Sequence, residues 1–230
     1  MTTRDDRAAA ADPPSVAVWL GSAAPVRSIR WLDGALKTAA KFRGATAVAA
    51  GEASWLDLAA DRAARAGLAS VGVPTDLRLD YLGWAQIMAS VARHLAATTI
   101  LVDEASRPAR FAEVAAIAEL TDAAQLTHVV ALAPDDAAIH ASRAAGTTLQ
   151  TVRIHGPAVI GVRIPGPPDD DYLTPTPSAA MRRLELAVLG LDPAVLAHRA
   201  LPSRANQQTR RALERIADHL AVHIAPRKDP

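Results

Sequence analysis

Short apolar runs alternate with segments of helical periodicity from Ser15 to Leu132, and this alternation constrains the fold more than any other feature of the sequence. A short apolar run between turn residues predicts a buried strand, and apolar residues spaced three and four apart predict the inner face of a helix. We expect strands at residues 15–20, 45–50, 68–73, 98–102 and 128–132, and helices at residues 29–41, 55–66, 80–97 and 111–120. This order predicts an α/β fold with a mostly parallel, doubly wound sheet and helices on both faces.

Capping and breaking residues support these boundaries. Ser54 is a predicted cap for the helix over residues 55–66, because its hydroxyl can accept a backbone N–H of the first turn. Gly67 suits the left-handed position that follows such a helix, and Pro74 ends the third strand.

The pattern changes from about Gly146 onwards. Residues 148–155 alternate in polarity and residues 158–164 form a second apolar run, and the pair predicts a C-terminal β-hairpin. A proline-rich segment at residues 166–177 precedes a helix that we expect over residues 178–189.

The last part of the chain has no evident packing partner of its own. Residues 190–206 contain two prolines and predict an extended arm, and residues 207–224 predict an amphipathic terminal helix. An isolated helix must fold back or dock on another chain, because it cannot bury its apolar stripe alone. We therefore divide the sequence into a disordered N-terminal arm (1–14), an α/β domain (15–189) and a C-terminal partner-clasping arm (190–230).

Composition excludes several classes of protein. The formal net charge is only +1, so a nucleic-acid binder that works by neutralising phosphates is not expected. The absence of cysteine excludes thiolate metal sites, iron–sulfur clusters and a cysteine nucleophile. No apolar run reaches the length of a membrane span and residues 1–14 do not resemble a secretory signal, so we expect a cytoplasmic protein without membrane insertion.

Local motifs give no catalytic or metal site. The phosphate-binding P-loop, the dinucleotide fingerprint G-x-G-x-x-G and the G-x-S-x-G nucleophile turn are all missing from the sequence. Asp169–Asp171 suit a hard cation, and His219 and His223 have the spacing of two zinc ligands. We favour a solvated loop for the acidic run and a solvated or partner-facing helix end for the histidines.

Three stretches make the sequence similar to the electron transfer flavoprotein beta subunit. They are Gly51 with residues 61–70 (DRAARAGLAS), residues 118–129 (AELTDAAQLTHV) and residues 149–161 (LQTVRIHGPAVIG). Tyr172, with Pro177 and Ser178, also resembles the proline-rich loop of that family. The resemblance is to the order and spacing of these stretches, which together cover most of the chain.

The resemblance implies a role and a partner. It implies a heterodimer with an electron transfer flavoprotein alpha-like subunit that holds most of the FAD, and a beta chain without catalytic residues of its own. Electrons would pass from a dehydrogenase to a downstream acceptor, and a branch tied to mycofactocin-dependent dehydrogenases fits the degenerate motifs. The beta subunit of this family usually also holds AMP, or in some members a second flavin.

The residues that the resemblance assigns to cofactor binding lie within or directly after the first and second predicted strands, and in the segment after the fourth. They are Trp19, Ala50, Gly51, Ser106, Arg107 and Arg110. Trp19 either stacks on a base or fills the core, and we favour the core. The loop and helix start at residues 103–114 (DEASRPARFAEV) lack the glycines of a phosphate cradle. Either the two arginines replace those glycines through their side chains, or the AMP site has been lost.

Two other functions remain open from the sequence. One is an adenine-nucleotide-binding sensor or stress-type module, and the other is a structural subunit that holds an alpha-like partner without any ligand. A stand-alone sensor is expected to have a glycine-rich phosphate loop, which this sequence lacks.

Overall fold

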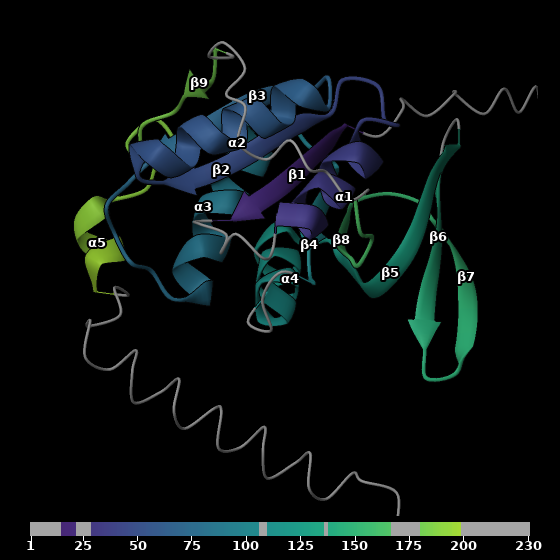
Figure 1. Cartoon of the computed structure of the whole chain (residues 1–230). Helices are drawn as coiled ribbons and strands as arrows, with labels where there is room; N and C mark the ends of the chain where they lie inside the picture. Colours follow the sequence, from purple (N-terminus) through teal and green to yellow (C-terminus); the bar gives the residue numbers. More distant parts are fainter. Residues whose placement is uncertain (1–14, 22–28, 106–109, 136–137, 167–179, 199–230) are drawn as a thin grey trace, which may run out of the picture.

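The computed structural model describes residues 15–21, 29–105, 110–135, 138–166 and 180–198. Within these ranges the strands form one nine-stranded sheet in the order β7-β6-β5-β8-β4-β1-β2-β3-β9 (Figure 1). The strands are β1 (Val16–Gly21), β2 (Thr46–Gly51), β3 (Ala69–Pro74), β4 (Thr99–Asp103), β5 (Ala124–Asp135), β6 (Ala138–Ala145), β7 (Thr148–Ile154), β8 (Ala158–Val162) and β9 (Arg182–Arg183). The helices are α1 (Ile29–Ala39), α2 (Ala53–Arg65), α3 (Tyr81–His94), α4 (Arg110–Thr121) and α5 (Pro193–Ala197).

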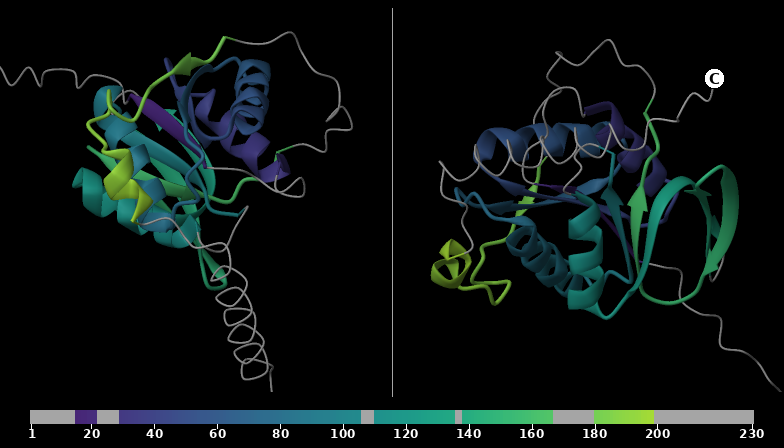
Figure 2. Two further views of the ribbon diagram at one scale, coloured as in Figure 1. Left: turned by 90° about the vertical axis from the view of Figure 1, so that its left-hand side faces the viewer. Right: turned by 90° about the horizontal axis from the view of Figure 1, so that it is seen from below.

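The sequence correctly predicted the α/β class and the doubly wound parallel core. Strands β5, β8, β4, β1, β2, β3 and β9 run parallel to their neighbours in this part of the sheet. Alternate residues of β1 face opposite layers: Val16 and Val18 pack with α1 and α2, and Ala17 and Trp19 pack with α3 and α4. Figures 1 and 2 show these two helical layers on opposite faces of the sheet.

Three helices end in the same backbone conformation. Positive φ angles occur just past the ends of α2, α3 and α4: 74° at Gly67, 50° at Ala96 and 49° at Asp122. The next N–H then bonds to a carbonyl five residues earlier, as from Ala97 to Ala92 at 2.9 Å. This is the Schellman arrangement, which turns the chain sharply into the following strand.

Ser54 does not cap α2 as predicted. The N-cap is Glu52, which has extended backbone and makes no side-chain cap bond, and Ser54 lies inside the first turn. By contrast, Asp80 caps α3 through a hydrogen bond from the Gly83 N–H to its Oδ1 at 2.7 Å.

The predicted hairpin between residues 148–155 and 158–164 is wrong. β7 pairs antiparallel with β6, whereas β8 lies between β4 and β5 and is parallel to both. The burial of the two strands explains the difference: all of β8 is buried, as expected for a central parallel strand, and β7 is largely exposed. β5, β6 and β7 instead form an antiparallel three-stranded ribbon, which extends from one side of the sheet (Figure 1).

The predicted helix over residues 178–189 is also wrong in its described part, residues 180–189. β9 adds to the edge of β3, and the Leu184 N–H donates to the Gly72 carbonyl at 2.9 Å. Leu184 and Leu186 are both buried against the layer of α3 and α4. After β9, residues 186–190 form turns rather than a helix.

Several predictions fall outside the described residues. These are the N-terminal arm at residues 1–14, the acidic run Asp169–Asp171, and the terminal helix at residues 207–224 with His219 and His223. The boundaries of the three proposed regions stay predictions.

Candidate functional site

The strand order places a switch point between β1 and β4. From β1 the sheet grows through β2 and β3 in one direction, and β4 then pairs with the other side of β1. Helical connections therefore diverge at the carboxyl ends of these two strands, and open α/β sheets bind ligands in that crevice. Gly21 ends β1 and Asp103 ends β4, so these residues mark the candidate site.

The end of β1 is held by a tryptophan of α2. Trp55 is buried, and its indole Nε1 donates to the Gly21 carbonyl at 2.9 Å. Gly21 has a φ of 80°, and the β1–β2 register shifts between Trp19 and Gly21. The register shift would otherwise leave the buried Gly21 carbonyl without a hydrogen-bond donor, and the indole N–H supplies one.

Trp19 lies on the other face of β1, beside Val48 of β2 and Val102 of β4. Its side chain is 0% exposed, and its Nε1 donates to Glu113 Oε2 at 3.1 Å. Glu113 belongs to the first turn of α4 and is itself buried. The tryptophan therefore connects the central strand to the start of the helix that follows the switch point.

Two acidic residues follow one another at the end of β4. Asp103 is 1% exposed, and its Oδ1 accepts the N–H of Ala105 at 3.0 Å. The backbone N–H of Glu104 donates to the Val162 carbonyl of β8 at 3.0 Å, and its side chain is also buried. The loop after β4 thus begins with two inward-facing carboxylates.

The Glu104 carboxylate supports a kink in β5. Its Oε2 accepts the His128 N–H at 2.8 Å, and its Oε1 lies 3.4 Å from His128 Nε2. His128 has a left-handed φ of 60°, where the β5–β8 pairing shifts register. A Cβ at Gly161 of β8 would approach Glu104 Oε2 to 2.5 Å, so glycine provides the space for this carboxylate.

Sequence reasoning missed Glu104, Glu113 and His128 as residues of this site. The pair Asp103–Glu104 directly after an apolar strand was a usable signal, because acidic residues at a strand end face the ligand crevice. Nothing in the sequence indicated the contacts to Trp19 and His128, which span 94 and 24 residues.

The predicted cofactor residues are only partly brought together. Ala50 and Gly51 end β2 and are buried, and the Gly51 carbonyl accepts the Thr75 N–H at 3.1 Å. Ser106 and Arg107 lie outside the described residues, and Arg110 begins α4 with its side chain outside them. The role of these six residues, Trp19 included, as cofactor ligands stays a prediction.

The described residues after β4 can be compared with a phosphate site only in part. Phosphate sites offer free backbone N–H groups and the positive end of a helix. Here the Ala105 N–H is bonded to Asp103, and Glu113 places a carboxylate in the first turn of α4. Residues 106–109, which complete the connection from β4 to α4, lie outside the described residues.

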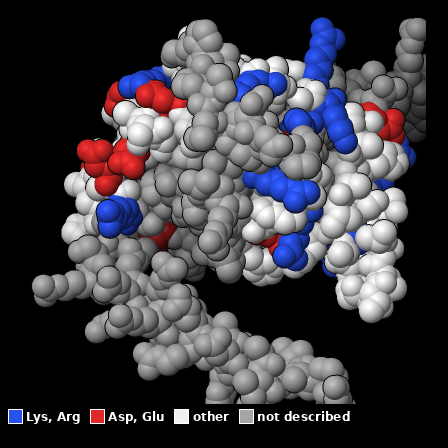
Figure 3. Space-filling view, viewed as in Figure 1, with Lys and Arg blue, Asp and Glu red and all other residues white. Residues whose placement is uncertain are grey.

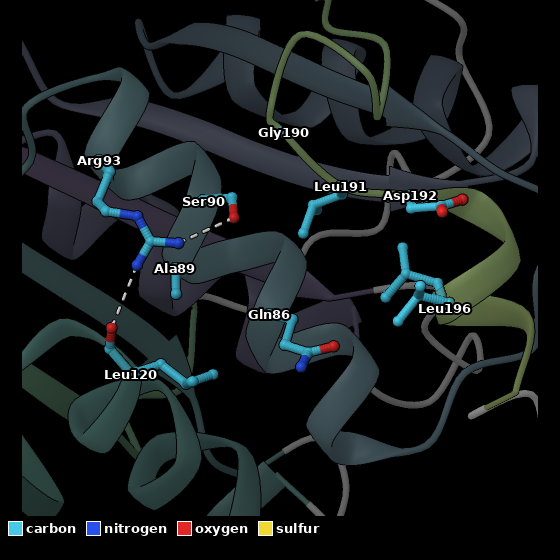
Figure 4. A pocket seen from close by; sticks show the side chains of 10 residues that line it. Gln86, Ala89, Ser90, Arg93, Leu120, Gly190, Leu191, Asp192 and Leu196 are labelled. Atoms are coloured by element: carbon cyan, nitrogen blue, oxygen red, sulfur yellow. Dashed lines mark hydrogen bonds between the residues drawn. The ribbon is translucent and has the colours of Figure 1, made fainter.

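A groove of about 350 Å³ lies apart from the strand ends, between α3 and the segment that leads into α5 (Figure 4). Arg93, one of its polar residues, donates to Ser90 Oγ at 3.1 Å and to the Leu120 carbonyl at 3.2 Å. The guanidinium is therefore occupied in joining α3 to the end of α4. The rest of the lining combines apolar side chains such as Leu191 and Leu196 with the polar Gln86 and Asp192.

Charge and helix length bear on other kinds of site. Both acidic and basic side chains lie on the face shown in Figure 3, as expected from the small net charge. Among the described residues, no group of three histidine, aspartate or glutamate side chains is arranged to hold a metal ion. None of the described helices is both long enough and apolar enough to cross a membrane.

Comparison with protein families gives a match, whereas comparison with curated proteins does not. No curated protein matches the sequence significantly. The profile of the Electron transfer flavoprotein domain matches residues 29–168, which is more than half of the chain and includes the strands from β2 to β8. The chain therefore belongs to the electron transfer flavoprotein family.

Proposed function

We propose that this chain is the beta-like subunit of an electron transfer flavoprotein. It pairs with an alpha-like subunit that carries most of the FAD, and the complex passes electrons from a dehydrogenase to a downstream acceptor. The flavin carries out the redox chemistry. This chain helps to position the flavin and contributes to the electrostatic environment around it. The family match over residues 29–168 is the observation that carries the proposal.

The exposed ribbon of β5–β7 supports a partner-binding role. β7 is an edge strand, and five of its seven residues are exposed. Leu149, at its start, is 71% exposed. An exposed edge with an apolar side chain favours pairing with another chain, because its outer N–H and C=O groups have no strand beside them.

The ribbon is held in shape by polar contacts on its surface. Asp135 Oδ2 accepts from Arg153 Nη2 at 3.2 Å and lies 3.1 Å from His140 Nε2. These contacts join β5, β6 and β7 across the ribbon. A ribbon that is already ordered loses less conformational entropy when a partner binds.

The FAD would approach from the carboxyl edge of the sheet. Gly51 ends β2 at that edge, where a backbone without a side chain permits close approach of a ligand. Residues 190–230 remain the proposed partner-clasping arm, of which α5 is the described beginning. The cytoplasmic location and the mycofactocin-dependent donor are further parts of the proposal.

Co-expression tests this function. The full chain, tagged, is expressed with an alpha-like subunit encoded in the same genome, and the complex is isolated through the tag. We expect a yellow one-to-one complex with the flavin absorbance bands, and bleaching of these bands when a donor dehydrogenase and its substrate are added. The chain expressed alone is the control and is expected to be colourless. A stable monomer that captures no flavoprotein would contradict the proposal.

A further inference from the structure

The end of α1 and the turn that follows it expose only positive charge. Lys37, Lys41 and Arg43 are all exposed there. The one acidic residue of α1, Asp33, is buried and paired with Arg62 of α2 at 3.3 Å. The surface from residue 37 to residue 44 is therefore cationic, although the net charge of the whole chain is only +1.

The ribbon brings a fourth cation to the same side of the molecule. The Lys41 Nζ donates to the Leu132 carbonyl of β5 at 3.4 Å, and Leu132 lies opposite Ala141 of β6. Leu132 and Ala141 both pack in the core cluster that contains the buried residues of α1. Arg143 is two residues beyond Ala141 in the same strand, so its side chain leaves the ribbon on this side.

We call Lys37, Lys41, Arg43 and Arg143 the basic face. Figure 3 shows basic side chains gathered on the side of the molecule that α1 and the ribbon form. Strands β6 and β7 contain no acidic residue at all. The acidic residue that ends β5, Asp135, already contacts Arg153 and His140.

Pairing distinguishes the basic face from other charged parts of the described chain. Elsewhere arginines lie within ion-pair distance of carboxylates, as in Arg65–Asp61, Arg153–Asp135 and Arg183–Asp57. Within the described ranges, no residue of the basic face forms an ion pair. Four like charges in one region repel one another, and a negatively charged partner would relieve that repulsion.

Arg143 is the residue of the basic face that gains most from such a partner. It is half-buried, and its Nε is buried without a hydrogen-bond partner among the described residues. A guanidinium that has lost part of its hydration is stabilised strongly by a carboxylate, which can accept two of its N–H groups. Arg143 also lies opposite Gln150 of β7, the exposed edge strand. The basic face and that edge are therefore neighbouring parts of one surface.

We propose that the basic face binds an acidic surface of the alpha-like subunit. The proposal rests on the proposed function and adds a second contact region to the β7 edge. One partner can cover both regions, because Arg143 and Gln150 face each other across a single pair of strands. Complementary charge at this place increases the rate of association and fixes the orientation of the two subunits.

Charge reversal tests the proposal in the co-expressed complex of the full chain. The test variant is Lys37→Glu with Arg43→Glu, because both side chains are exposed and neither makes a hydrogen bond or ion pair with the described residues. The matched control is Arg182→Glu with Arg183→Glu, which changes the net charge equally at the opposite edge of the sheet. Sedimentation followed through the flavin absorbance gives the Kd of each complex, and circular dichroism checks that each variant is folded.

Affinity and its salt dependence are the expected readouts. At about 50 mM salt we expect the Kd to rise at least tenfold in the test variant and to change less than about twofold in the control. Raising the salt to about 500 mM should weaken the wild-type complex and leave the test variant nearly unchanged, because salt screens the charges that the variant has already lost.

Arg143 is tested separately, because its side chain is half-buried. Arg143→Lys keeps the positive charge and is expected to retain most of the affinity, whereas Arg143→Gln should raise the Kd about three- to tenfold. Equal losses in these two variants would mean that shape rather than charge matters at this position, and would overturn the role of Arg143.

The outcomes separate this proposal from the function. A yellow complex with the same Kd in wild type, test variant and control would overturn the proposal and leave the electron carrier intact. Equal weakening in the test variant and the control would also overturn it, because net charge alone would then explain the effect. If the wild-type complex binds a single-stranded RNA and only the test variant loses that binding, the face is a nucleic-acid site instead. Failure of the wild-type chain to form any flavin complex would contradict the function, and this proposal with it.

Discussion

Trp19 and Glu113 are joined by a hydrogen bond of 3.1 Å between the indole Nε1 and the carboxylate Oε2, across 94 residues of sequence. One residue lies in the central strand and the other in the first turn of α4. The bond couples the middle of the sheet to the helix that follows the switch point. It also explains how a buried tryptophan and a buried carboxylate are both tolerated in an alanine-rich core.

Replacing the indole should reveal the strength of this bond. We expect Trp19→Phe to lower the free energy of unfolding by about 2–4 kcal/mol, since it removes a bond to a charged group and part of a core side chain. Urea denaturation measures the loss. Trp84→Phe, in the same core cluster, is the matched control for ring volume and should cost about half as much. Equal losses in the two variants would show that the bond to Glu113 contributes little.

Glu104 should be essential for the kink in β5. We expect Glu104→Ala to lower the free energy of unfolding by about 1–3 kcal/mol, because the partly buried N–H of His128 loses its acceptor. Glu104→Gln is the control, since its amide oxygen can still accept that N–H. In amide hydrogen exchange, His128 should exchange faster in the alanine variant and little faster in the glutamine variant. Unchanged exchange at His128 in both would contradict the role of Glu104.

The helix ends offer a pair of opposite predictions. Ala96 and Gly67 occupy equivalent left-handed positions after α3 and α2. Because only glycine adopts this conformation without strain, Ala96→Gly should raise the free energy of unfolding by about 0.5–1 kcal/mol. Gly67→Ala should lower it by about 1 kcal/mol, measured in the same urea titration. Nothing lies within 4 Å of a Cβ at Gly67, so a clash would not account for that loss.

The parallel core was predictable because its signals are local. Apolar runs such as residues 98–102 and the capping glycine Gly67 reflect short-range periodicity and backbone preference. The ribbon was predictable only in part: strands were expected at residues 128–132 and 148–155, but residues 138–145 (AIHASRAA) form β6 with little of the usual strand propensity. Their conformation depends on pairing with β5 and β7, which no local window of sequence contains.

The same distinction applies to the site. The βαβ order predicted that Trp19 lies in the first strand and that Gly51 follows the second, whereas the switch point between β1 and β4 is known only from the strand order of the structure. The acidic side chains were visible in the sequence, but their partners were not. The bonds of Glu104 to His128 and of Glu113 to Trp19 arise from tertiary packing between segments that are far apart in the sequence.

The exposed edge of the ribbon should contribute to binding the alpha-like subunit. Leu149→Asp is expected to leave folding unchanged, because the side chain is 71% exposed, and to reduce the yield of the complex at least tenfold. Val188→Asp is the matched control, with 59% exposure at a turn near the other end of the sheet. Both variants are tagged, co-expressed with the alpha-like subunit and isolated in parallel, and flavin absorbance per tagged chain measures the complex. Circular dichroism checks that each variant is folded. If the folded Leu149→Asp chain recovers as much flavin as the Val188→Asp chain, the alpha-like subunit does not bind at Leu149. A charge buried in an interface at that position would weaken the complex.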